Sequence, residues 1–543
     1  MPIRPPGPDA PTSIHGDAVA PTPSAVEVAD VIDRRTFVAA AGAAALGVLA
    51  REEAGAVSSA GDLPFAGAAE AAAAVRRREV SAVELLDLVL ARIERHNPKL
   101  NAIVVSTAES ARERAAEADR ALGRGEVWGP LHGVPMTIKE TFEMAGVRTT
   151  AGAPFLARHV PERDAVVVER ARRAGAVVVG KTNVPFMASD WQSYNEIYGR
   201  TDNPWDVERT PGGSTGGGAA AVAAGLSYLS IGSDIGGSIR IPAGFCGIYG
   251  HKPTLGVVPL DGHIPPPPGT PPGAPLELPV AGPLARSATD LRLALEVLGG
   301  PVGREATAYR WSLPSPRRAA LREYRVRYVV DDPYCPVTAE VSRRLGDAVA
   351  ALRDAGARME EGWPEGVDPA AQFETYVYLL YQAVDAGLPD DMKGAIRGAA
   401  DSSPMAGIRA RALDDGYHES MRRRVEREAA RAVWSRFFAT HDAFLSPVTF
   451  VPAIPHDPSQ PFEARRIATP EGERTYLDLL RWIAFATLTG CPATAAPVGL
   501  TTAGLPVAIQ IQGPYLEDAT PIDLAGRLGE ALGGFRPPPA FAG

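Results

Sequence analysis

The chain has 543 residues, of which 45% are apolar and 22% charged, and this composition is typical of an ordinary globular protein. Its 55 basic and 64 acidic residues give a net charge of −9 without any basic run, so the charge pattern argues against nucleic-acid binding. Cys246, Cys335 and Cys491 are few, odd in number and far apart. This spacing predicts buried free thiols rather than a disulfide framework or a zinc site.

The N-terminal stretch that ends at Ala56 is interpreted as a leader. Residues 1–30 are rich in Pro, Ala and Asp and show no apolar period, which predicts disorder. Arg34 and Arg35 then precede an apolar run that ends at Ala50, a pattern that resembles a twin-arginine export signal. The run is too short for a good membrane span, and an Ala-rich helix of the folded domain is the alternative. We expect an exported protein, periplasmic or secreted, without a stable membrane span in its mature form, and a cytoplasmic one if the segment is not a signal.

The first half of the folded part alternates between helical and strand-like segments. Two helices are predicted within residues 66–96, the second opened by the capping-box pattern Ser81 to Glu84 and stopped by Asn97-Pro98. The following predicted elements are a strand at 102–106, a helix at 108–122, a short strand ending at Lys139, a helix at 164–174 and a strand at 176–179. This alternation predicts an α/β protein with a partly parallel sheet.

The second half shows helical patterns and, near its end, strands of the same sheet. The predicted elements are helices at 288–298 and 476–488 and strands at 442–447, 491–498 and 505–512. Residues 300–440 contain helical patterns without a chemical motif, and we treat them as a variable helical region. No linker divides the folded part, so we expect a single domain over residues 57–543.

Residues 211–252 hold two Gly-rich turns, one around Ser214 and one around Ser238. A helix at 219–226 and a short strand at 229–232 are predicted between them. Glycines cluster where the backbone needs positive φ or comes close to a ligand. The pattern indicates a serine on a loop whose backbone N–H groups converge on one spot, which is the combination of nucleophile and oxyanion hole that acyl transfer needs.

Two standard motifs match this part of the sequence only formally. The Gly-x-Ser-x-Gly pattern around Ser214 lacks the preceding strand of a nucleophile elbow, and His251 is interpreted as structural, so a Ser-His-acid triad is not favoured. Residues 175–182 match the phosphate-loop pattern, but their β-branched interior is interpreted as a strand.

The remaining candidate for a general base is a lysine. The chain has only five, Lys99, Lys139, Lys181, Lys252 and Lys393, against 50 arginines, and three of them lie between residues 139 and 252. Arginine cannot release its proton at useful pH, whereas a lysine buried in a dry pocket can. Service as a base near neutral pH needs a downward pKa shift of roughly 3 units.

These segments together resemble the amidase signature family. The resemblance rests on the two Gly-rich serine segments, the upstream lysine segment and three shorter matches: 212–217, 232–242, 133–139, 180–183, 203–205 and 504–510. It spans roughly residues 66–530 and is weakest over 300–440. It implies the fold of that family, a central mixed β-sheet covered by helices on both sides.

The resemblance also implies roles for individual residues. Ser238 corresponds to the nucleophile, Ser214 to a bridging serine with a cis peptide bond next to it, and Lys139 to the base. The backbone N–H groups of Ile235, Gly236, Gly237 and Ser238 would form the oxyanion hole. Asp234 and Arg240 would brace the nucleophile turn as an ion pair, and Thr215 stands where many members have a second serine.

The function implied is hydrolysis of a carboxylic amide of a small-molecule substrate through an acyl-enzyme on Ser238, without a metal or cofactor. The alternatives are the glutamine-hydrolysing subunit of a tRNA amidotransferase and a non-catalytic binding protein on the same scaffold. The export pattern and the residues Ile235 and Ile241 favour a general amidase. The candidates to rim the acyl pocket are Trp191, Gln192, Tyr194, Tyr198 and the tyrosines near 376–381, with structural packing as the alternative for each. They do not identify the amide. A homodimer is the default expectation for the assembly.

Overall fold

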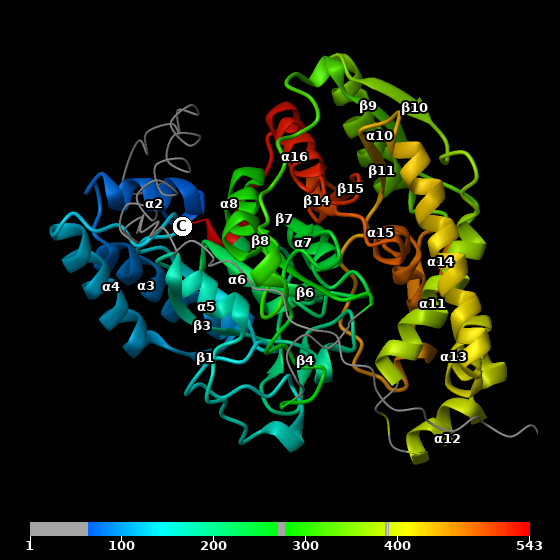
Figure 1. Cartoon of the computed structure of the whole chain (residues 1–543), viewed down its shortest axis with the longest axis horizontal. Helices are drawn as coiled ribbons and strands as arrows, with labels where there is room; N and C mark the ends of the chain where they lie inside the picture. Colours follow the sequence, from blue (N-terminus) through cyan, green and yellow to red (C-terminus); the bar gives the residue numbers. More distant parts are fainter. Residues whose placement is uncertain (1–62, 270–276, 386–387, 389, 543) are drawn as a thin grey trace, which may run out of the picture. The chain divides into compact units, whose positions relative to one another are not determined.

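A computed structural model describes residues 63–269, 277–385, 388 and 390–542 of the chain (Figure 1). The chain divides into two units, Met1–Ala56 and Val57–Gly543. The predicted leader, with its paired arginines and apolar run, lies outside the described residues, so its interpretation as an export signal stays a prediction. In the described part, no helix is both long and apolar enough to cross a membrane.

The larger unit is built on one mixed sheet. In the described residues this sheet has 11 strands in the order β1-β3-β2-β6-β8-β7-β14-β15-β11-β9-β10. Their bounds along the sheet are Ile103–Ser106, Val177–Thr182, Pro135–Lys139, Leu229–Asp234, Val280–Ala285, Tyr249–Lys252, Ala493–Leu500, Pro506–Gln512, Ala443–Pro447, Arg325–Tyr328 and Arg358–Glu361. Strand β2 runs parallel to both β3 and β6, whereas β6 and β8 are antiparallel. The α/β class with a partly parallel sheet is therefore confirmed.

Helices flank this sheet on both sides, as predicted (Figure 1). The helices before β9 are α2 (Ala68–Arg76), α3 (Ala82–Leu100), α4 (Ala108–Gly123), α5 (Val166–Arg173), α6 (Gly216–Ala223), α7 (Arg240–Cys246), α8 (Ala288–Leu298) and α9 (Glu305–Ala308). The later ones are α10 (Ala339–Asp354), α11 (Pro369–Asp385), α12 (Asp390–Gly398), α13 (Pro404–Asp414), α14 (Tyr417–Phe438), α15 (Ala484–Thr489) and α16 (Ala519–Leu532). Helix α11 packs against α13, α14 and α15, so most of the variable region forms a helical layer of its own.

Three sequence predictions about these elements need correction. Helix α3 does not stop at Asn97-Pro98 but runs to Leu100, because the Asn97 side chain accepts the backbone N–H groups that follow the helix end, those of Ala102 and Ile103. The 300–440 region is not purely helical, since β9 and β10 add two strands to one edge of the sheet.

The third correction concerns the predicted helix at 476–488. It is split into a short 3-10 helix, Tyr476–Leu480, and α15. The split lies where side chains from other elements reach backbone carbonyls: Gln510 donates to Trp482 and Arg240 donates to Ile483. Tertiary hydrogen bonds therefore override the local helical pattern.

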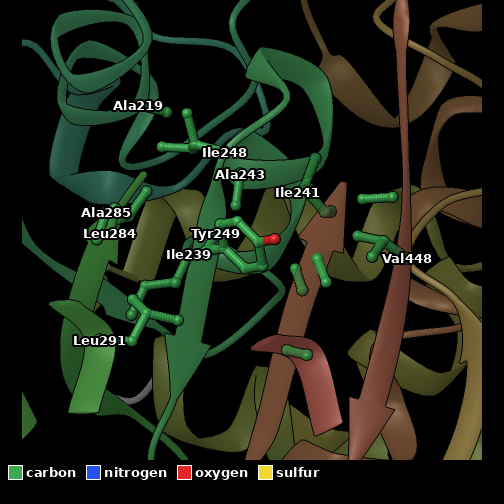
Figure 2. Packing of buried hydrophobic residues seen from close by; sticks show 14 of the residues in the cluster. Ala219, Ile239, Ile241, Ala243, Ile248, Tyr249, Leu284, Ala285, Leu291 and Val448 are labelled. Carbon is green, nitrogen blue, oxygen red and sulfur yellow. The ribbon is translucent and has the colours of Figure 1, made fainter. Parts of the chain in front are cut away.

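The residues that follow the second serine turn lie in the hydrophobic core. Ile239, Ile241 and Ala243, on and just before α7, are fully buried and pack near Tyr249 and Leu284 (Figure 2). The three cysteines are buried free thiols, as predicted. The turn that carries Ser238 is therefore fixed at one end by β6 and at the other by a buried helix.

Candidate active site

Sheet topology places the predicted lysine beside the second serine turn. Lys139 is the last residue of β2, and β2 pairs in parallel with β6 through Ile138 and Ile231. Since the carboxyl ends of parallel strands meet at one edge of a sheet, the end of β2 and the turn that follows Asp234 leave the sheet together. This edge brings together residues nearly a hundred positions apart in the sequence.

Lys139 contacts the first serine turn and the end of β6. Its Nζ atom lies 2.7 Å from Ser214 Oγ and 2.9 Å from Ser233 Oγ, and the side chain is 0% exposed. Burial lowers the pKa of Lys139 from 10.5 to about 7, against the opposing effect of the negative charge on Asp234. A large fraction of this amine is therefore neutral near pH 7 and has a lone pair for a proton.

The two serine turns are in direct contact. The Thr215 backbone N–H donates to the Ser238 carbonyl oxygen at 3.2 Å, and the Thr215 hydroxyl donates to the Ser233 carbonyl at 3.3 Å. The Gly213–Ser214 peptide bond is cis, as the resemblance implied. Ser238 follows a strand, whereas Ser214 follows irregular chain and precedes α6, so the predicted structural contrast between the two serines is confirmed.

A buried ion pair braces the second turn. Arg240 Nη2 donates to Asp234 Oδ1 at 2.8 Å and Arg240 Nε donates to Oδ2 at 3.0 Å. The same carboxylate accepts the backbone N–H groups of Gly237 and Ile239. Burial alone would raise the pKa of Asp234, but the guanidinium of Arg240 and these hydrogen bonds hold it at about 2. The predicted bracing pair is therefore present and charged.

The outer side of Arg240 is also saturated. Its Nη1 donates to Ile483 O at 2.8 Å and to Gln510 Oε1 at 2.6 Å, and its Nη2 donates to Thr487 Oγ1 at 2.8 Å. A guanidinium that is 0% exposed is tolerated because each of these groups replaces a water molecule. The ion pair thus links the turn to the segment that carries α15 and to β15.

Two aromatic side chains orient the peptide groups of the turn. The Tyr376 hydroxyl donates to the Ile235 carbonyl at 2.9 Å, and Trp191 Nε1 donates to the Gly236 carbonyl at 2.7 Å. Because N–H and C=O point in opposite directions in a trans peptide, each bond also sets the direction of the next N–H group. The sequence suggested both residues only as candidates for the rim of the acyl pocket and did not reveal that either side chain anchors the turn.

The two glycines of the turn are needed for different reasons. A Cβ on Gly237 would lie 2.8 Å from Ile241 Cδ1, and its φ is +88°, so backbone conformation and packing require glycine there. A Cβ on Gly236 would meet Leu480, Trp191 and Tyr376 at 3.4 to 3.8 Å, which are ordinary contacts. Glycine is therefore required by local geometry at position 237, whereas the contacts around position 236 do not by themselves require it.

The other candidate bases near the motif have partners elsewhere. Lys181 donates to Thr149 and lies 4.0 Å from Glu140, and Lys252 donates to the Pro253 carbonyl at 2.8 Å. His251 contacts Asp518 at 3.1 Å and Thr494 at 2.9 Å, in agreement with its structural interpretation. Residues 175–182 mostly form β3, which confirms that they are not a phosphate loop.

Three further rim candidates, which lie close to Trp191 in the sequence, have structural contacts. Gln192 donates to the Asp457 carbonyl, Tyr194 donates to Asp190, and Tyr198 donates to Glu140. Among the described residues, no group of three His, Cys, Asp or Glu side chains is arranged to hold a metal ion. The absence of a metal or cofactor remains a prediction.

The fold and the site define a class before any relative is considered. A partly neutral buried amine, a hydroxyl in contact with it, and a braced turn with a second hydroxyl lie together on a mixed α/β sheet, which is the arrangement expected from the resemblance to the amidase signature family. The Amidase family model matches residues 84–521, and the chain belongs to the amidase signature family.

Relatives and solved structures agree with this family. The chain is 35% identical over 512 residues to a glutamyl-tRNA(Gln) amidotransferase subunit from Anaeromyxobacter sp. (strain K), covering 87% of this chain and 97% of that protein. It is similar to the native peptide amidase of Stenotrophomonas maltophilia, with a TM-score of 0.68, 27% identity and coverage of 88% and 99%. It is also similar to 6-aminohexanoate cyclic dimer hydrolase in complex with substrate, with a TM-score of 0.69, 25% identity and coverage of 88% and 99%.

Replacement of Arg240 tests the bracing ion pair. The Arg240→Met protein should lose about 3–5 kcal/mol of unfolding free energy, because the Asp234 carboxylate would stay buried without its partner. Arg292→Met is the matched control, since Arg292 pairs with Glu296 on the exposed surface of α8 and should cost less than about 1 kcal/mol. Chemical denaturation of both variants measures the difference, and equal losses would show that the pair does not brace the fold.

Proposed function

We propose that this protein hydrolyses carboxylic amides through an acyl-enzyme on Ser238. The observation that carries the proposal is the buried Lys139 amine, whose pKa is about 7 and which lies 2.7 Å from Ser214 Oγ. A base with its pKa near the working pH combines a useful neutral fraction with enough basicity to take a proton. Ser214 stands next to the turn that carries Ser238, so it is the group through which that proton would pass.

The proposed reaction moves one proton in a closed cycle. Neutral Lys139 accepts the proton of Ser214, and Ser214 accepts the proton of Ser238 as Ser238 Oγ bonds to the amide carbon. The relay then returns a proton to the leaving nitrogen when the C–N bond breaks, which leaves the acyl group on Ser238. A water molecule activated by the same relay attacks the ester, and the carboxylate product leaves with Ser238 restored.

The backbone of the second turn is the proposed oxyanion hole. The Gly237 N–H is engaged by Asp234 Oδ1 at 2.9 Å, so we assign the oxyanion mainly to the N–H groups of Ile235, Gly236 and Ser238. The hydrogen bond from Tyr376 to the Ile235 carbonyl supports this assignment, because it fixes the direction of the Gly236 N–H before a substrate binds.

The acyl side of the substrate is expected to be apolar or aromatic. A Cβ at Gly236 would lie nearest to Leu480, Trp191 and Tyr376, which carry no charge. The polar hydrogens of Trp191 and Tyr376 are already donated to the turn, so these side chains offer neither a charge nor a free donor hydrogen to an acyl group. Aryl or long acyl amides fit such surroundings better than charged acyl groups.

The second candidate function is glutamine hydrolysis within a multi-subunit amidotransferase. It is supported by the curated relatives, since the proteins from Anaeromyxobacter sp. (strain K) and Synechococcus sp. (strain CC9605) are both named as glutamyl-tRNA(Gln) amidotransferase subunits and match over 97% and 96% of their lengths. Glutamine hydrolysis uses the same serine chemistry, so the two candidates differ in acyl recognition and in partners.

The cellular location follows the choice between these two functions. Export through the pattern at Arg34 and Arg35 belongs with a general amidase that acts as a monomer or homodimer. A tRNA-dependent reaction takes place in the cytoplasm, so the second candidate requires that the same segment is not a signal.

Labelling with a fluorophosphonate tests the nucleophile. The wild-type protein should be modified once, on the peptide that contains Ser238, and Ser238→Ala should not be modified at all. Ser214→Ala and Lys139→Ala should keep Ser238 but react at least 100-fold more slowly, because general-base assistance typically contributes about 10²–10⁴-fold. Intact-mass spectrometry over time measures these rates, and full labelling of Ser238→Ala would sink the assignment.

A panel of amides separates the two candidate functions. Aryl acylamides, short aliphatic amides, C-terminally amidated peptides and glutamine would be offered to the purified full-length chain, with Ser238→Ala as the blank. We expect aryl or long acyl amides to exceed glutamine in kcat/KM by at least about 10-fold, because the side chains around Gly236 are uncharged. Glutamine as the best substrate, together with co-purifying partner subunits, would establish the amidotransferase function instead.

A further inference from the structure

A histidine that the sequence did not suggest stands behind the catalytic lysine. His263 Nε2 lies 2.8 Å from Ser233 Oγ, and Ser233 Oγ lies 2.9 Å from Lys139 Nζ. The three side chains form a continuous hydrogen-bonded chain that ends at Ser214, 2.7 Å from the amine. His263 belongs to the loop after β7, and its ring is buried beside Phe142, with the ring centroids 4.8 Å apart.

The donor and acceptor roles in this hydrogen-bonded chain are fixed at the end formed by His263. His263 Nδ1 lies 2.8 Å from the Pro265 carbonyl oxygen, and a carbonyl oxygen only accepts hydrogen bonds, so Nδ1 carries the proton. Burial and the nearby positive charge of Lys139 lower the pKa of His263 to about 3, so the ring is neutral at working pH. In the neutral ring with a protonated Nδ1, Nε2 has a lone pair and no hydrogen.

This tautomer determines what Ser233 does. The Ser233 hydroxyl has one hydrogen, and it donates this hydrogen in a hydrogen bond to the Nε2 lone pair of His263. Ser233 Oγ then has only lone pairs for Lys139, so Lys139 must donate to it. The Ser233 carbonyl, 3.5 Å from Lys139 Nζ, also offers only lone pairs.

A neutral amine has two hydrogens and one lone pair. With its hydrogens directed at the two oxygen atoms of Ser233, the lone pair of Lys139 is left for the Ser214 hydroxyl. We propose that His263 is a positioning residue, which acts through Ser233 to direct the lone pair of neutral Lys139 at Ser214. This rests on the proposed function, in which Ser214 gives its proton to Lys139.

Without the histidine, the donor and acceptor roles of Ser233 and Lys139 would no longer be fixed. In His263→Leu, Ser233 could donate its hydrogen to the lone pair of Lys139, and a lysine in that state could not accept a proton from Ser214. Among the described residues, the charged groups that act on these hydrogen-bonded side chains are Lys139 itself, on β2, and Asp234, at the end of β6. Neither is removed in the variant, so a change in rate would report the hydrogen-bond direction.

The test measures the rate of fluorophosphonate labelling of Ser238 between pH 5 and pH 10 in the full-length protein. His263→Leu should lower the plateau rate about 10- to 100-fold, within the range for general-base assistance. The midpoint of the acid limb should stay near pH 7 or move lower, because the neutral lysine gains a hydrogen bond. His263→Gln should recover part of the rate, since its side-chain carbonyl can accept from Ser233. A midpoint that moves toward 10 would mean that His263 only excludes water, and would overturn the proposal.

A double-mutant comparison isolates the path through Ser233. In a Ser233→Ala background, His263→Leu should change the rate less than about twofold, because the residue through which it acts is gone. An equal loss in both backgrounds would overturn the proposal. His132→Leu is the matched control for the loss of a buried histidine, since His132 bonds to Trp128 and Ala118, away from the site, and should keep the wild-type labelling rate.

The outcomes also separate this inference from the proposed function. If wild-type protein is not labelled on Ser238, the proposed nucleophile is wrong. If wild-type and His263→Leu proteins are labelled on Ser238 at equal rates, the nucleophile stands and only the role of His263 fails. Thermal unfolding of each variant identifies any that loses its rate by losing its fold.

Discussion

The proposed chemistry of the site depends on the burial of the Lys139 amine away from water. Burial of Lys139 shifts its pKa from 10.5 to about 7, which corresponds to about 5 kcal/mol of preference for the neutral form. The parallel pairing of β2 with β6 makes this burial possible, because it sets the lysine at the end of a fully buried strand. The two serines in contact with its amine satisfy the nitrogen without adding a charge.

The ion pair between Asp234 and Arg240 affects the balance between the neutral and protonated forms of Lys139. Asp234 lies at the end of β6, and its negative charge favours the protonated form of Lys139. Arg240 pairs with that carboxylate on the other side and anchors it to Gln510 and Thr487. The turn therefore gains a buried anion that holds its backbone, and the positive charge of Arg240 opposes the effect of this anion on Lys139.

Local pattern was enough to predict most elements and the structural contrast between the two serines, and it singled out Lys139 as the candidate base. The strand before Ser238, the missing strand before Ser214 and the scarcity of lysine are all visible in the sequence. The orientation of the turn by Trp191 and Tyr376 was not predictable, because these residues lie far from the turn in sequence and meet it only through the tertiary fold. For the same reason, His263 carried no signal, and tertiary hydrogen bonds broke the helix predicted at 476–488.

The pKa of Lys139 is the quantity that tests the account most directly. With only five lysines in the chain, a protein labelled with ¹³C at the lysine ε-carbon should give few signals, and Lys139→Arg identifies the one from residue 139. This signal should titrate with a midpoint near pH 7, so that Lys139 is neutral above that pH and protonated below it. A midpoint near 10.5, the ordinary value, would contradict the assignment of Lys139 as the base.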